Sequence, residues 1–165
     1  MVFAYRLAAA LAVSAPLAFA ASAQGPARGA GQQAPAKAAV TIESANGGHG
    51  FTVELARTPA QQERGLMFRT NIPADGGMLF VPYPGDGGPP REASFWMKNT
   101  PTALDIVFIR ANGTIARIAA DAAPYSETNL KSGEPVAAVL ELLAGTTAKL
   151  GIRAGDKVRW ELPRR

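Results

Sequence analysis

Two carboxylates, Asp105 and Glu141, interrupt runs that are otherwise apolar. Side chains of a β-strand alternate between its two faces. In residues 104–109 and 136–143 both faces are apolar apart from these two acids, so each carboxylate is expected at the interior or its rim. An unpaired buried carboxylate is costly, and each one therefore needs a cation, a set of N–H donors or a raised pKa.

Polar residues suited to pair with these acids occur nearby in the sequence. A polar stretch, residues 98–101, comes shortly before Asp105, and Arg64 lies near the end of a predicted helix. An arginine at such a place can hold a carboxylate or an anionic ligand through two parallel hydrogen bonds. The pattern suggests a ligand-binding cleft with Trp96 or Met97 as its apolar wall and with five polar lining residues: Arg64, Lys98, Asn99, Asp105 and Glu141.

The same residues permit two other interpretations. In a hydrolase, Asp105 and Glu141 would be an acid–base pair, which requires both carboxyls to face one cleft about 5–10 Å apart. In a structural or chaperone-like envelope protein, Asp105 would hold the loop of Lys98 by an ion pair and N–H bonds, and Glu141 would do the same elsewhere. Candidate catalytic residues are thus Asp105 and Glu141, and whether the protein is an enzyme stays open.

Several other chemistries find little support in the composition. The chain has no cysteine, which excludes disulfides, thiolate metal sites and thiol nucleophiles. The single histidine, His49, lies among glycines, so a site with two histidine ligands is impossible. Met67, Met78 and Met97 could bind Cu(I), but each lies in an apolar run that core packing explains. We expect no metal and no cofactor.

The N-terminus has the three parts of a secretory signal peptide. Arg6 is followed by an apolar run over 7–20 and by Ala21-Ser22-Ala23, a small-x-small cleavage pattern. The run is shorter than the about 20 residues that span a bilayer, which favours cleavage after Ala23 over an uncleaved tether. We expect a periplasmic or secreted protein that contacts the membrane only through residues 1–23. Residues 24–38, rich in Gly, Pro, Ala and Gln, are interpreted as a flexible linker.

Residues 39–165 suffice for one domain with one core. The whole chain has a formal net charge of +4, and its cations are scattered rather than clustered. A nucleic-acid surface would carry a denser basic patch with interleaved aromatic residues. We therefore expect no nucleic-acid partner, and we expect a monomer.

Short apolar runs separated by Gly, Pro and Asn predict a mainly β (α+β) domain, a compact barrel-like or sandwich antiparallel structure with one or two short helices. Thr58, Pro59 and Gln61 form a capping-box pattern that starts a helix ending near Leu66 or Met67. Asn112-Gly113 favours a tight hairpin turn. A second helix is expected with Thr146 as its cap. The expected strands are 40–43, 51–55, 78–81, 95–97, 106–110, 114–118, 136–143 and 157–162.

Several short motifs occur in a distinctive order: ERGLMFR (63–69), GMLF (77–80), FWMKNT (95–100), LDIVFI (104–109), VLE (139–141) and GD (155–156). Together they resemble the DUF192 family, also called UPF0127, over about residues 40 to 162. The resemblance implies a compact, mainly β domain, often exported, whose function is unestablished. It also singles out seven residues as a candidate ligand site: Arg64, Met67, Trp96, Lys98, Asn99, Asp105 and Glu141. Our leading hypothesis is a binding module for a small polar, anionic or sugar-like ligand near residues 98–105.

Overall fold

The structure, a computed structural model, describes residues 35–163. The predicted signal peptide and most of the predicted linker lie outside these residues. The first strand begins at Lys37, inside the segment that we assigned to the linker. The described elements, in chain order, are β1 (Lys37–Ser44), β2 (Gly47–Ala56), α1 (Pro59–Arg64), β3 (Met78–Phe80), β4 (Arg91–Phe95), β5 (Leu104–Ile109), β6 (Ile115–Ala122), β7 (Leu130–Val136), β8 (Ala138–Leu143), α2 (Thr146–Leu150) and β9 (Lys157–Glu161).

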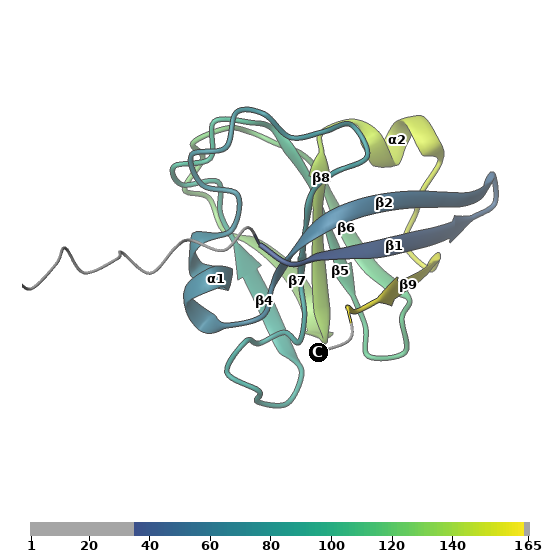
Figure 1. Ribbon diagram of the computed structural model, residues 1–165, viewed down its shortest axis with the longest axis horizontal. Helices are drawn as coiled ribbons and strands as arrows, with labels where there is room; N and C mark the ends of the chain where they lie inside the picture. The colour runs from purple at the N-terminus through teal and green to yellow at the C-terminus, as the bar shows by residue number, and fades with distance from the viewer. Residues whose placement is uncertain (1–34, 164–165) are drawn as a thin grey trace, which may run out of the picture. The chain divides into compact units, whose positions relative to one another are not determined.

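Seven of these strands form one curled sheet in the order β6-β5-β8-β3-β2-β1-β9 (Figure 1). Its neighbours are antiparallel except β2 and β3, which are parallel because the chain between them returns through α1. The outer strands of the order meet at one end: the Ile115 N–H donates to Asp156 O at 2.9 Å, and the Val158 N–H donates to Gly113 O at 2.8 Å. The sheet is therefore a half-barrel, which confirms the predicted mainly β, barrel-like domain.

The half-barrel buries one apolar cluster on each face. The inner core includes Val40, Val53, Val107 and Leu140, whereas the outer core includes Ile106, Phe108 and Val139 on the other face. The two-stranded sheet of β4 and β7 contributes Ala93 and Val136 to the outer core. Because β5 and β8 have a core on each side, their side chains are buried on both faces, which explains the continuous apolar runs in their sequences.

Helix α1 begins as the capping box predicts. The Gln61 N–H donates to Thr58 Oγ1 at 3.3 Å, and the Thr58 N–H donates to Gln61 Oε1 at 3.1 Å. The helix ends at Arg64, earlier than predicted, because Gly65 adopts a positive φ of 47°. The Gln62 amide group then donates to Ala56 O at 3.0 Å and Pro82 O at 2.7 Å, and accepts from the Gly85 N–H at 2.8 Å. This single side chain joins α1 to the loop that follows β3.

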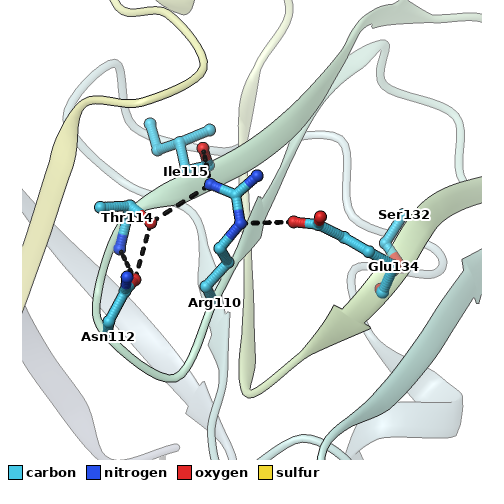
Figure 2. A network of polar contacts seen from close by, with 6 residues as sticks. All are labelled: Arg110, Asn112, Thr114, Ile115, Ser132 and Glu134. Carbon is cyan, nitrogen blue, oxygen red and sulfur yellow. Dashed lines mark hydrogen bonds and ion pairs between the residues drawn. The ribbon is translucent and has the colours of Figure 1, made fainter.

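The predicted hairpin around Asn112-Gly113 is confirmed as β5 and β6. Figure 2 shows how its turn is fastened to β7. Asn112 Oδ1 accepts from the N–H and hydroxyl of Thr114, at 3.0 and 2.7 Å. The guanidinium of Arg110 donates to Ile115 O at 3.0 Å and forms an ion pair with Glu134 of β7 at 2.5 Å. The hairpin and the smaller sheet are thus held together across this edge.

Other boundaries differ from the predictions for identifiable reasons. Strand β7 was not predicted, since Gly133 and Pro135 break its apolar pattern. Strand β4 ends at Phe95, so Trp96 and Met97 follow the strand instead of belonging to it. Helix α2 has Gly145, not Thr146, at its N-cap. In the part of the chain that the structure describes, no helix has the length and apolar character needed to cross a membrane.

Candidate functional site

Asp105 is completely buried, and its carboxylate accepts four hydrogen bonds. Its Oδ1 accepts from the N–H groups of Asp121 and Gly145, at 3.0 and 3.2 Å. Its Oδ2 accepts from both the N–H and the hydroxyl of Thr147, each at 2.8 Å. The donors come from β6, from Gly145 at the N-cap of α2 and from α2 itself, so Asp105 fastens β5 to β6 and to α2 at one end of the half-barrel. A buried carboxylate with such a donor set is satisfied within the fold.

Glu141 is also buried, with 5% of its surface exposed, but its surroundings are the opposite. Its Oε2 atom has no hydrogen-bond partner among the described residues. The residues directly beside it on β3 and β5 are Met78 and Ile106, both apolar. Desolvation raises the pKa of Glu141 from 4.5 to about 8. The side chain therefore carries its proton at neutral pH and has an unused hydrogen-bonding atom.

The two acids project from opposite faces of the same strand pair. Asp105 lies opposite Leu142 in the β5–β8 ladder, and Glu141 lies opposite Ile106. Directly opposed residues share a face. Leu142 belongs to the inner core and Ile106 to the outer core, so a layer of backbone separates the two carboxyls. They do not face one cleft, and the acid–base pair suggested by the sequence is not formed.

Glu141 lines a cavity of about 290 Å³ between α1, the loop after β3 and the end of β4. Its buried lining includes Leu66, Phe80 and Thr100. The more exposed lining includes aromatic and charged residues, namely Glu63, Arg64, Tyr83, Asp86, Arg91, Phe95 and Trp96. Ligand pockets range upwards from about 300 Å³. The cavity is therefore suited to a small molecule that brings a polar group to Glu141.

The local sequence fixes both the floor and the wall of this cavity. Gly77, just before β3, packs closely on the backbone of Glu141 in β8. A β-carbon at this position would lie 2.1 Å from Glu141 O, so the close approach requires glycine. Phe80, on the same strand, packs edge-to-face against Phe95 at a centroid distance of 5.1 Å. Gln62 joins α1 to the facing loop, as described above. The cavity walls are thus set by contacts that do not involve Glu141 itself.

Four of the seven predicted site residues line this cavity: Arg64, Met67, Trp96 and Glu141. Lys98, Asn99 and Asp105 do not belong to its lining. The Lys98 ammonium lies 5.0 Å from the centroid of the Trp96 ring, a cation–π arrangement. Asn99 has a positive φ of 56°, and its carbonyl accepts the Phe68 N–H at 2.8 Å. Both residues shape the loop beside the cavity.

The predicted ion pair between Asp105 and Lys98 is not formed. Asp105 faces the inner core and takes all its donors from Asp121, Gly145 and Thr147. The candidate site is therefore the cavity around Glu141 and not the Lys98–Asp105 loop.

Sequence reasoning missed the part of the cavity that comes from residues 82–95. Asp86 accepts the Gly88 N–H at 2.9 Å and pairs with Arg91 at 3.2 Å. Burial raises the pKa of Tyr83 from its ordinary value. In the sequence this part of the cavity appears only as a tyrosine and two oppositely charged residues in a Pro/Gly-rich stretch. Hydrophobic periodicity does not predict where such a stretch lies in the fold.

The described residues contain no group of three His, Cys, Asp or Glu side chains suited to a metal ion. Met78 and Met97 pack in the outer core, in agreement with the packing interpretation, whereas Met67 lines the cavity. A second hollow of about 450 Å³ lies beside α2, lined by Asp75, Thr146, Lys149 and their neighbours. No unpartnered buried side-chain atom is recorded among its described lining residues.

Comparisons with known proteins identify the family of the chain. The model of the family described as "DUF192: Uncharacterized ACR, COG1430" matches residues 40–160. A crystal structure of a protein of unknown function from Novosphingobium aromaticivorans DSM 12444 is 47% identical, with a TM-score of 0.69, over 74% of this chain and 84% of that one. A Sinorhizobium meliloti 1021 protein described as a candidate transcription regulator is 45% identical, with a TM-score of 0.73, over 79% and 98%. No curated protein matches the chain. The chain belongs to the DUF192 family, for which no activity or ligand is established.

Proposed function

We propose that this domain is a binding module for a small polar molecule, held in the cavity above Glu141. The observation that carries the proposal is the unpartnered Oε2 atom of a buried glutamate that lines an open cavity. Leaving a buried polar atom without a partner costs about 1–3 kcal/mol. Asp105 shows that the fold can supply a buried acid with donors, and at Glu141 it supplies none. A bound molecule would supply the missing partner.

The remaining lining agrees with this proposal. Phe80, Phe95 and Trp96 provide apolar surface, and the arginines and acids at the rim provide orientation. An apolar pocket with a few convergent polar groups is the usual composition of a small-molecule site. The acid–base pair of Asp105 and Glu141 is not available to a catalytic role, because Asp105 lies on the other side of the sheet.

A thermal-shift screen tests the proposal with monosaccharides, small carboxylates, inorganic phosphate and small amines as probes. A molecule that binds only the folded state raises its melting temperature. We expect at least one probe class to stabilise the wild type and to lose that effect in Glu141→Met, which keeps the side-chain length but removes both oxygens. Arg159→Ala is the matched control, since Arg159 pairs with Glu43 on the β1–β9 edge and does not line the cavity.

Two results would contradict the proposal. In one, no probe class shifts the melting temperature of the wild type. In the other, every stabilising probe acts equally on Glu141→Met. Either result would favour the structural alternative, in which these residues only maintain the fold.

A further inference from the structure

The cavity is lined by Glu141 and Arg64, two hydrogen-bond donors whose side chains have no partner among the described residues. The first is the carboxyl of Glu141, which carries a proton at neutral pH. The second is the guanidinium of Arg64, which forms no hydrogen bond or ion pair with the side chains and backbone of residues 35–163. Arg91, the other arginine of the lining, is already paired with Asp86. The cavity thus combines one unpaired positive charge with one neutral O–H donor.

The other ionisable groups of the lining provide no second positive charge without a partner. Asp86 is occupied by Arg91 and by the Gly88 N–H, and burial keeps Tyr83 in its neutral form. Glu63 and Arg64 are both exposed on α1, where solvent and salt screen their charges, and of the two only the guanidinium of Arg64 can donate hydrogen bonds to a ligand. The strands beside Glu141 place only Met78 and Ile106 directly opposite it. The guanidinium of Arg64 is therefore the charged donor that the lining offers to a ligand, and its two-pronged geometry matches a carboxylate.

We propose that the cavity binds a small monocarboxylic acid as its carboxylate, which pairs with Arg64 and accepts a hydrogen bond from the unpartnered carboxyl of Glu141. This inference depends on the proposed function and adds the ligand class and a dependence on pH. Carboxylates accept guanidinium donors in a two-pronged geometry, and an O–H···O⁻ bond is among the short, strong hydrogen bonds. An inorganic phosphate dianion would leave one charge without a partner.

The proton on Glu141 determines how binding responds to pH. Ionisation of Glu141 removes the O–H donor and places a second negative charge beside the ligand. The affinity for a carboxylate therefore falls as the pH rises above about 8, where Glu141 loses its proton. A cationic ligand would respond in the opposite direction, because an ionised Glu141 would attract it. The direction of the pH effect thus separates the two ligand classes.

Calorimetric titration of the full chain with sodium lactate at pH 6 and pH 9 tests the inference. Lactate remains ionised throughout this range. We expect its Kd to be about tenfold weaker at pH 9, because only about one molecule in ten keeps the Glu141 proton one pH unit above the pKa. In Glu141→Gln the amide N–H replaces the O–H donor, so binding should persist at both pH values and lose its pH dependence. Arg64→Ala should weaken binding at both pH values, and Arg159→Ala should leave it unchanged.

The other probes distinguish failure of this inference from failure of the proposed function. If glucose, phosphate or methylammonium binds in a Glu141-dependent way and lactate does not, the ligand class is wrong and the binding site stands. Lactate binding that strengthens from pH 6 to pH 9, or that keeps its pH dependence in Glu141→Gln, also overturns the inference. If none of the four probes binds the wild type at either pH, both the inference and the proposed function fail.

Discussion

Asp105 and Glu141 are both buried acids on the β5–β8 strand pair, and the structure treats them in opposite ways. Asp105 faces the inner core and accepts four hydrogen bonds from β6 and from the first residues of α2 with its N-cap. Glu141 faces the outer core, has no recorded partner for its Oε2 atom among the described residues, and lines a cavity open to solvent. Burial and an apolar sequence context are the same for both, so neither property shows which acid is structural.

What separates the two residues is the supply of hydrogen-bond donors. Donors for Asp105 are provided by backbone N–H groups that the fold brings together from distant parts of the chain, such as Asp121 and Thr147. Around Glu141 the neighbouring strands present apolar side chains. Substitution of a structural acid is expected to lower the stability of the protein, whereas substitution of an acid that binds a ligand is expected to weaken ligand binding. Three measurements test this contrast.

The largest expected effect is the pH dependence that Glu141 gives to stability. The pKa of Glu141 is about 8 in the folded state and about 4.5 when solvated, so the folded protein holds a proton that the unfolded chain releases in this interval. The stabilisation is complete below about pH 4.5 and is lost as the pH rises towards 8. Relative to Glu141→Gln, the wild type should lose on the order of 4 kcal/mol of unfolding free energy across this interval.

Urea denaturation of both proteins at several pH values between 4.5 and 9 provides the measurement. Other titrating groups are common to the two proteins and cancel in the difference. A difference that stays constant with pH would show that Glu141 is ionised and solvated in the folded state, and the contrast with Asp105 would disappear.

The next effect is the loss of stability in Asp105→Asn. The amide nitrogen cannot accept a hydrogen bond, so two of the four donors lose their acceptor inside the protein. We expect the unfolding free energy to fall by about 2–3 kcal/mol, as measured by urea denaturation at pH 7. Asp86→Asn is the control, because Asp86 forms a half-exposed ion pair, and such pairs contribute about 0–1 kcal/mol. Equal losses in the two variants would remove the structural role assigned to Asp105.

The smallest effect is expected for Glu141→Met at pH 4.5, where the titration of Glu141 has hardly begun to lower the stability of the wild type. Replacing an unpartnered buried polar group by an apolar group of similar shape is neutral or stabilising, so the unfolding free energy should stay the same or rise by about 1 kcal/mol. Equilibrium denaturation in the absence of ligand measures this change. A loss comparable with that of Asp105→Asn would mean that Glu141 has a structural partner and that the two acids do not differ in role.

The sequence predicted much of the fold because local patterns determine it. Asn112-Gly113 produced the hairpin, and Thr58 with Gln61 produced the helix start, since both depend on residues a few positions apart. The strand β7 was missed because its glycine and proline are tolerated by pairing with β4, a tertiary contact. The parallel pairing of β2 with β3 also depends on how α1 returns the chain.

The candidate site was predicted in part. Alternation along the strands correctly marked Asp105 and Glu141 as buried. It did not show that they face different cores, because that depends on how β5 and β8 are aligned. Lys98 was assigned to Asp105 on closeness in sequence, and the structure instead supplies donors from residues about 16 to 42 positions away. Hydrogen-bond partners at such separations cannot be obtained from spacing alone.

The three hydrogen bonds of the Gln62 side chain affect how fast a ligand could enter and settle. Two of them join α1 to residues 82–85, which are the two facing walls of the cavity, and the third joins α1 to Ala56 at the end of β2. The entropic cost of fixing the distance between these walls is incurred when the protein folds. Ligand binding therefore requires no further ordering of the walls. Association should then proceed in a single step limited by diffusion and by the orientation of the ligand, without a slow rearrangement of the protein.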